Sequence, residues 1–199
     1  MIFLNQNQID EVVDLFNQGK IIAFPTETVF GLGVLSTKKE YFEELVRVKK
    51  RDPNKPFTLM ISSLEQVEDI LYVSPLAKKI INKFSPGPLT IILKAKENIP
   101  SYLDLNTGFV GIRIPDSKFI LSVLEKLNKP LLVPSANPAN LEPAKNDKEA
   151  YDYFKDEISG IVKGESTSNI PSTVVKIDGE NITLLREGSI KLKEILEVK

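Results

Sequence analysis

The sequence predicts an α/β domain whose sheet is mixed, with both parallel and antiparallel strands. Strand and helix patterns alternate along the chain without repeats or low-complexity stretches, as in layered α/β domains. The strand patterns at 172–177 and 182–186 are joined by the turn sequence DGEN, which favours an antiparallel hairpin. No linker divides the 199 residues, so we expect a single domain over residues 1–199.

Hydrophobic periodicity predicts the individual elements. Apolar residues at helical spacing predict a helix over residues 6–18, and Gly19 is suited to cap its end. The apolar run at 20–24 predicts a buried strand, and helical spacing returns at 38–50. Apolar runs bounded by proline, glycine and polar turns predict the rest in order: strand 57–61, helices 64–71 and 75–84, strands within 85–95 and 110–115, helix 117–128, and strands within 130–137, 172–177 and 182–186.

The composition excludes several kinds of chemistry. The net charge is −1, so attraction for an anionic ligand has to come from a local cluster of cations. The absence of cysteine excludes disulfides, thiolate metal sites and a cysteine nucleophile, and the absence of histidine excludes the commonest general base. No apolar stretch approaches the roughly 20 residues that span a bilayer, and no signal-peptide pattern opens the chain. We therefore expect a cytoplasmic protein with no membrane contact.

A tripeptide of an apolar residue, proline and a hydroxyl residue occurs three times, as FPT (24–26), VPS (133–135) and IPS (170–172). The first two follow predicted strands and the third precedes one. If the strand at 173–177 runs antiparallel to the other two, all three hydroxyl groups reach one edge of the sheet, where α/β sheets bind ligands. Proline with serine or threonine also makes ordinary turns, but three occurrences, with Asn137 beside the second, favour a polar pocket.

Basic residues cluster after the helix at 38–50, in the segment RVKKRDPNKP (47–56). Cations in a last helical turn complement the helix dipole and proline ends the helix, which explains the segment without any ligand. Lys49, Arg51 and Lys55 also stand at a forced chain reversal, which suits a phosphate clamp. The residues alone leave both interpretations open.

Two further arginines lie on predicted strands. In VGIRI (110–114), alternation places the aliphatic side chains on one face and Gly111 with Arg113 on the other. That face is either solvated or a ligand site, for which Gly111 leaves room. Arg186 stands at the end of the last strand pattern. Because no Walker, dinucleotide-binding, zinc-protease, GxSxG or kinase motif is present, the residues indicate only a pocket for anionic ligands such as nucleotides and carboxylates.

Seven segments, in this order, carry a specific resemblance: KIIAFPTETVFGLG, VKKRDPNKPF, SPGPLTIIL, VGIRIPD, VPSAN, PSTVV and LLREGSI. Over residues 8–190 the chain resembles the YrdC-like family of L-threonylcarbamoyladenylate synthases. The resemblance implies a twisted mixed sheet flanked by helices, similar to dihydroxybutanone-phosphate synthase, with an open central cavity. It also implies that threonine, bicarbonate or carbon dioxide, and ATP give threonylcarbamoyl-AMP and pyrophosphate, for threonylcarbamoyl modification of adenosine 37 in tRNA.

The family pattern K-x-R followed by S-x-N falls on Lys49, Arg51, Ser135 and Asn137, which the resemblance implies as the catalytic group. A carbamate formed on the amine of threonine can attack the α-phosphate itself, so no protein nucleophile is required. Mg²⁺ is expected to arrive on ATP, with no metal site in the protein. The resemblance implies ATP contacts from Arg51, Lys55, Ser135, Asn137 and Arg186, and threonine contacts from Thr26, Thr28, Arg113 and Ser172.

The chain departs from the family pattern at two positions. Met60 stands where many members carry histidine, and Phe109 where others carry a hydroxyl residue. We also expect Gly31 and Gly33 to let the backbone pass close to the ligand. The chain resembles the single-domain form of the family, so transfer to tRNA would need separate partner proteins.

Three alternatives remain beside the synthase. A sister group without an established synthase role resembles the chain at FTLM (57–60) but typically lacks the S-x-N pair. The carbamoyl-adenylate-forming domain of hydrogenase maturation proteins comes with cysteine-rich fingers, and this chain has no cysteine. An RNA-binding module is the third, because residues 38–55 hold seven Lys or Arg against four Asp or Glu, and weak RNA binding is also compatible with the synthase.

Overall fold

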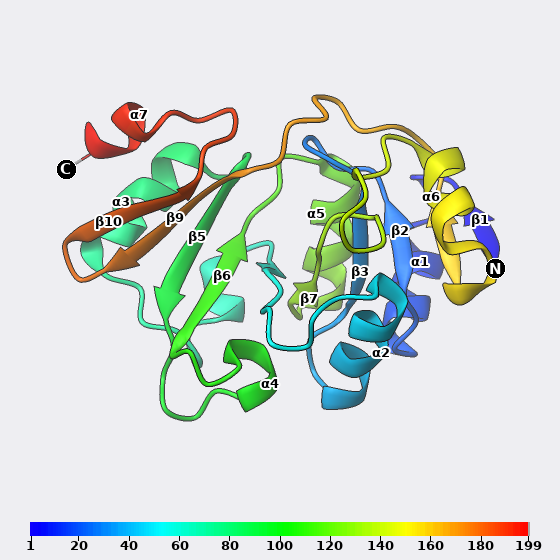
Figure 1. Ribbon diagram of the computed structural model, residues 1–199, viewed down its shortest axis with the longest axis horizontal. Helices are drawn as coiled ribbons and strands as arrows, with labels where there is room; N and C mark the ends of the chain where they lie inside the picture. The colour runs from blue at the N-terminus through cyan, green and yellow to red at the C-terminus, as the bar shows by residue number, and fades with distance from the viewer. Residues whose placement is uncertain (199) are drawn as a thin grey trace.

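Ten strands form one sheet in the computed structural model, which describes residues 1–198 (Figure 1). The strands are β1 (Ile2–Leu4), β2 (Ile22–Phe24), β3 (Gly31–Leu35), β4 (Leu59–Met60), β5 (Leu89–Lys94), β6 (Phe109–Arg113), β7 (Leu131–Leu132), β8 (Gly160–Val162), β9 (Thr173–Asp178) and β10 (Asn181–Arg186). Their order in the sheet is β1-β8-β2-β3-β7-β4-β6-β5-β9-β10. Parallel pairs such as β5–β9 lie beside antiparallel pairs such as β9–β10, so the predicted mixed sheet and its C-terminal hairpin are confirmed.

Helices flank the sheet, and their apolar faces fill two hydrophobic clusters. The helices are α1 (Ile9–Asn17), α2 (Lys39–Lys49), α3 (Pro75–Phe84), α4 (Ser101–Asp104), α5 (Lys118–Leu127), α6 (Asp147–Phe154) and α7 (Leu192–Leu196), with 3₁₀ turns at Leu64–Gln66 and Lys155–Glu157. One cluster joins α1 and α5 to Phe24, and the other joins α2, α3 and α6 to Ala23. Because these neighbours on β2 point in opposite directions, the sheet lies between the two clusters. Within residues 1–198, every helix is too short or too polar to cross a membrane.

The predicted helix at 75–84 coincides with α3, while the one at 64–71 is wrong. Helix α3 begins after Ser74, whose Oγ accepts a hydrogen bond from the backbone N–H of Ala77 at 3.1 Å. At 64–71 only a 3₁₀ turn forms, because Leu71 pairs with Ala95 just beyond β5 and this pairing extends the chain. Within residues 1–198, six helices and strands lie outside the predicted elements, namely β1, β3, β8, α4, α6 and α7, as does the 3₁₀ turn at Lys155–Glu157.

Strand β9 runs parallel to β2 and β7, whereas the predicted meeting of the three hydroxyl groups required it to be antiparallel to them. The ladders from β2 through β3, β7, β4, β6 and β5 give β9 the same sense as β2 and β7, so the antiparallel condition is not met. Ser172, before β9, nevertheless lines the same cavity as Thr26 and Ser135, which follow β2 and β7. A twist of roughly 20–25° per strand pair adds up to roughly 120–150° over these six pairs, which accounts for the convergence.

Gly31 and Gly33 lie inside β3 rather than in a ligand loop. A Cβ atom on Gly33 would come within 2.6 Å of the Phe24 ring, and one on Gly31 within 2.9 Å of Val133. Both glycines therefore allow close packing of side chains from the neighbouring strands. Gly31 also lines the cavity, whereas Gly33 does not, so the expectation that Gly33 admits a ligand is corrected.

Candidate functional site

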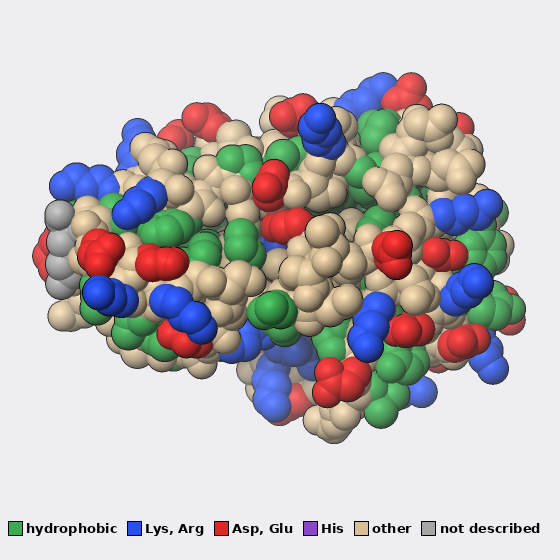
Figure 2. Space-filling model, turned by 90° about the horizontal axis from the view of Figure 1, so that it is seen from above, with side chains coloured by type: hydrophobic (Ala, Val, Ile, Leu, Met, Phe, Trp, Pro, Cys, Tyr) green, Lys and Arg blue, Asp and Glu red, His purple; other side chains and the backbone are tan. Residues whose placement is uncertain are grey.

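A cavity of about 230 Å³ opens where β2, β6, β7 and β9 begin or end. Three guanidinium groups line it, those of Arg51, Arg113 and Arg186, and no carboxylate within residues 1–198 is among its lining side chains. On the outer surface shown in Figure 2, basic and acidic side chains are interspersed. Within the cavity, the three guanidinium groups supply the positive charge that an anionic ligand needs. Hydroxyl groups complete its polar lining: Thr26, Thr58, Thr90, Ser135 and Ser172.

The turn after β2 is held by its own hydroxyl groups. Oγ1 of Thr26 donates to the carbonyl of Val29 at 2.7 Å and accepts from the backbone N–H of Thr28 at 3.2 Å. The hydroxyl of Thr28 lies 3.0 Å from that of Thr26. Thr26 lines the cavity, whereas Thr28 is buried behind it. Thr28 therefore supports Thr26 and does not reach the predicted substrate position itself.

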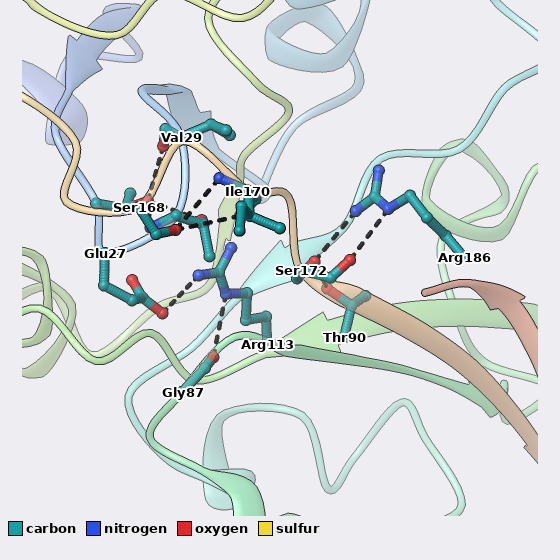
Figure 3. Close-up of polar contacts among 11 residues, drawn as sticks. Glu27, Val29, Gly87, Thr90, Arg113, Ser168, Ile170, Ser172 and Arg186 are labelled. Atoms are coloured by element: carbon teal, nitrogen blue, oxygen red, sulfur yellow. Dashed lines mark hydrogen bonds and ion pairs between the residues drawn. The ribbon is translucent and has the colours of Figure 1, made fainter. Parts of the chain in front are cut away.

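Arg113, at the end of β6, is fixed by two contacts that leave other N–H groups available. Its Nη2 donates to Oε1 of Glu27 at 2.5 Å, and its Nε donates to the carbonyl of Gly87 at 3.3 Å (Figure 3). The side chains of Arg113 and Glu27 are 9% and 16% exposed, so the pair is largely desolvated. A guanidinium group carries five N–H donors, so the remaining ones can meet an anion in the cavity. Glu27 is thus the counter-ion of Arg113 and does not itself line the cavity.

Ser172 lies between Thr90 and Arg186 (Figure 3). Its Oγ is 2.7 Å from Oγ1 of Thr90 and accepts from Nη2 of Arg186 at 3.2 Å, while its carbonyl accepts from Nε of Arg186 at 3.0 Å. Burial, together with the nearby charge of Arg113, lowers the pKa of Arg186. Thr90 is not among the residues that the sequence patterns indicate, although a threonine within the apolar strand LTIIL (89–93) is a polar residue that burial requires to be hydrogen-bonded.

Lys49 is buried beneath the cavity and does not line it. Its Nζ donates to the carbonyls of Ser135 and Asn137 at 2.8 and 2.7 Å, and to Oδ1 of Asn137 at 3.0 Å. An ammonium group has three protons, and these contacts use all of them. Direct phosphate binding by Lys49 therefore does not fit this arrangement. Burial, followed by the charge of Arg51, lowers the pKa of Lys49 to about 8.

Further hydrogen bonds, beside those from Lys49, hold the S-x-N segment in place. Oγ of Ser135 donates to Oδ1 of Asn137 at 2.6 Å, and Nδ2 of Asn137 donates to the carbonyl of Leu141 at 2.6 Å. Ser135 lines the cavity, whereas Asn137 is 7% exposed and lies outside the lining. Asn137 thus acts on the loop that carries Ser135, and this arrangement argues against the predicted contact of Asn137 with the nucleotide.

Arg51 faces the cavity from the loop after α2. Its Nε and Nη2 donate to the carbonyls of Lys55 and Pro56, each at 3.2 Å, and its guanidinium lies 5.1 Å from the centre of the Phe57 ring. Burial lowers the pKa of Arg51. Lys55 is exposed and does not line the cavity, which argues against its predicted contact with ATP. Only the backbone of Lys55 contributes, by holding Arg51.

The two departures from the family pattern lie in different places. Met60 lines the cavity from β4, so the side chain that replaces histidine borders any ligand there. Phe109, at the start of β6, does not line it, and Nζ of Lys176 lies 3.4 Å from the centre of its ring. Of the two substitutions, only Met60 is placed to alter ligand contacts.

Comparisons with known proteins agree with this architecture. The Sua5_yciO_yrdC family model, described as "Telomere recombination", matches residues 14–188. A Methanocaldococcus jannaschii protein named "Putative threonylcarbamoyl-AMP synthase" is 34% identical over 199 residues, covering 96% of this chain and 93% of that protein. The Bacillus subtilis threonylcarbamoyl-AMP synthase is 32% identical over 195 residues, covering 96% of this chain and 56% of that protein. The chain thus spans about half the length of the Bacillus relative.

A solved structure matches the whole described fold. The crystal structure of Pyrococcus abyssi Sua5 complexed with L-threonine superposes with a TM-score of 0.93 and 29% sequence identity. The match covers 100% of this chain and 61% of the Pyrococcus chain. The Pyrococcus protein whose fold this chain shares was thus solved with an amino acid bound.

Proposed function

Because the chain belongs to the Sua5/YciO/YrdC family, we propose that it forms L-threonylcarbamoyl-AMP from L-threonine, bicarbonate or carbon dioxide, and ATP, releasing pyrophosphate. The relatives named for this synthase support the proposal. The observation that carries it is one cavity lined by three guanidinium groups and a set of hydroxyls, with no lining carboxylate within residues 1–198. Such a cavity suits a ligand pair that brings a carboxylate and a triphosphate together.

The cavity divides naturally between the two substrates. Arg113 and Ser172 would hold the carboxylate of threonine, with Thr26 nearby, and Arg51 and Arg186 would hold the phosphates of ATP. Ser135 borders the region between them. A carbamate on the threonine amine attacks the α-phosphorus, a new oxygen–phosphorus bond forms, and pyrophosphate leaves with the electrons of the broken bond. The protein then has to orient the reactants and neutralise the charge that develops at phosphorus.

The buried residues Lys49 and Asn137 contribute to the same reaction without lining the cavity. Their hydrogen bonds fix the loop of Ser135, so both are positioning residues in this proposal. A preorganised loop loses little freedom in the transition state, which is why a group that never touches the substrate affects the rate.

We propose that Mg²⁺ enters with ATP. Within residues 1–198, no group of three His, Cys, Asp or Glu side chains is arranged to hold a metal ion. Mg²⁺ in nucleotide enzymes often keeps several waters and is held mainly through phosphate oxygens, which this residue set permits. When bound, it would neutralise part of the triphosphate charge.

We propose that the product serves threonylcarbamoyl modification of adenosine 37 in tRNA, through separate transfer proteins in the cytoplasm. The reaction is tested by measuring pyrophosphate release from ATP with threonine and bicarbonate each omitted in turn. Release that depends on both substrates supports the synthase, while equal release without threonine favours a generic ATPase or a carbamoyl-adenylate-forming enzyme.

A further inference from the structure

We infer that Thr90 is a positioning residue for the amino-acid substrate: with Arg186, it sets the Ser172 hydroxyl as a hydrogen-bond donor to the threonine carboxylate. The inference rests on the proposed function and adds a residue to it. It starts from a contact in the cavity wall, where the Thr90 and Ser172 hydroxyls lie 2.7 Å apart and Arg186 Nη2 lies 3.2 Å from the Ser172 hydroxyl (Figure 3).

Proton counting gives the direction of these hydrogen bonds. Arg186 is only a donor, so Ser172 Oγ accepts from it and one lone pair is used. A hydroxyl group has one proton and two lone pairs, so Thr90 can fill the second lone pair of Ser172. Ser172 then has its single proton left for a third partner. An anion in the cavity, which can only accept, selects this arrangement over the one in which Ser172 donates to Thr90.

Strand pairing and a backbone hydrogen bond fix the backbone around Thr90 and Ser172. Thr90 lies on β5 and pairs with Val174 of the adjacent β9, so Ser172 directly precedes a strand that β5 holds in parallel register. The backbone N–H of Thr173 donates to the carbonyl of Pro88 at 2.9 Å, which fixes the residue after Ser172. Thr90 and Ser172 are only 4% and 5% exposed. Water is therefore a poor substitute for the Thr90 hydroxyl.

Charge also favours a carboxylate at this place. Arg113 and Arg186 both line the cavity, and the charge of Arg113 acts on Arg186 strongly enough to contribute to its lowered pKa. A carboxylate bound by Arg113 relieves this repulsion and accepts the Ser172 proton. Thr90 carries no charge, so its contribution is the orientation of Ser172 alone.

The test is calorimetric titration of L-threonine into the full chain and its variants. Thr90→Val removes the hydroxyl at similar volume and should weaken threonine binding about 3- to 10-fold, the loss of one net hydrogen bond. Thr90→Ser restores a hydroxyl and should bind within about twofold of wild type. Thr183→Val makes the same chemical change at an exposed position of β10 and should leave binding unchanged. Should valine unfold the protein, Thr90→Ala makes the same deletion.

A double-mutant cycle with Ser172→Ala separates positioning from general packing. If Thr90 acts only through Ser172, Thr90→Val should cause no further loss in the Ser172→Ala background. Full additivity, wild-type binding by Thr90→Val, no rescue by Thr90→Ser, or an effect on ATP affinity instead of threonine affinity would each overturn the inference. A wild-type chain that binds no threonine would instead overturn the proposed function, together with this inference.

Discussion

Nη2 of Arg113 lies 2.5 Å from Oε1 of Glu27, and this ion pair joins the end of β6 to the turn after β2. Glu27 also has a second oxygen, Oε2, that is buried without a hydrogen-bond partner among residues 1–198. The pair orients the guanidinium group of Arg113, because Nη2 donates to Glu27 while Nε donates to the carbonyl of Gly87. The geometry of the proposed carboxylate site therefore depends on a residue that does not line the cavity.

Two replacements of Glu27 should separate the contributions of its charge and of its hydrogen bond to the free energy of unfolding. Glu27→Ala leaves the buried Arg113 without its counter-charge and should lower the free energy of unfolding by about 3 kcal/mol. Glu27→Gln keeps an oxygen acceptor for Arg113 and should lose less than half of that amount. Urea unfolding of the two variants and the wild type measures both values. Equal stability of all three proteins would show that the ion pair does not hold Arg113.

Arg113→Lys should raise the KM for threonine about tenfold or more, equivalent to about 1.4 kcal/mol. Lysine provides a point charge where a carboxylate is matched by the two-pronged guanidinium group. Arg113→Ala should raise it further, because the substrate carboxylate then lies unpaired in a largely desolvated site. ATP affinity, titrated without threonine, should change little in both variants. Loss of ATP binding with threonine binding intact would assign Arg113 to the nucleotide.

Arg51→Ala should lower kcat on the order of 10²-fold while the protein stays folded. Arg51 faces the cavity, whereas the neighbouring cation Lys55 is exposed outside it, so Lys55→Ala should keep wild-type kcat and KM for ATP. Steady-state kinetics with circular dichroism as the folding control measures the contrast. Equal loss of activity in the two variants would mean that the loop acts through its overall charge.

Lys49 should give the reaction a pH dependence near neutrality. Its pKa is lowered by burial from 10.5 to about 8, and the neutral amine has two N–H groups for three acceptors. As the pH rises through about 8, the loop of Ser135 should loosen and kcat should fall. Lys49→Arg, whose charge does not titrate in this range, should be less active but lack this decline. A flat wild-type profile from about pH 7 to 9 would contradict the role of the charged amine.

The same lowered pKa predicts the opposite trend for stability. The folded-state pKa of Lys49 lies below the unfolded value, so the unfolded chain binds more protons between about pH 8 and 10.5. This group therefore makes the free energy of unfolding rise with pH over that window. A fall in kcat there is consequently not caused by unfolding through Lys49. Comparing the pH dependence of unfolding in wild type and Lys49→Met isolates this contribution.

The sequence predicts this molecule best where local patterns decide the structure. The hairpin of β9 and β10 has a short polar turn between two apolar runs, and α3 begins at a serine followed by proline, so both follow from local chemistry. Strand β3 was missed because its glycines belong to contacts with Phe24, a residue on another strand. Such contacts are tertiary and leave no periodic signal in the chain.

The residues that line the cavity were more predictable than the contacts that they make. The tripeptides and the arginines identify Thr26, Arg113, Ser135 and Ser172, all of which line one cavity. The buried hydrogen bonds of Lys49 are not predictable from the sequence, because a lysine at a helix end is usually a solvated cation. Only the fold brings three oxygen acceptors to its Nζ. The links from Glu27 to Arg113 and from Thr90 to Ser172 likewise depend on strand order.

The central claim is that this cavity couples ATP to threonine and bicarbonate. The most direct measurement is pyrophosphate release from ATP by the purified chain with Mg²⁺, with each of the other substrates omitted in turn, and mass spectrometry of the nucleotide product. We predict release only when threonine and bicarbonate are both present, with threonylcarbamoyl-AMP as the product. Equal release without threonine, or a product that lacks the threonine mass, would contradict the account.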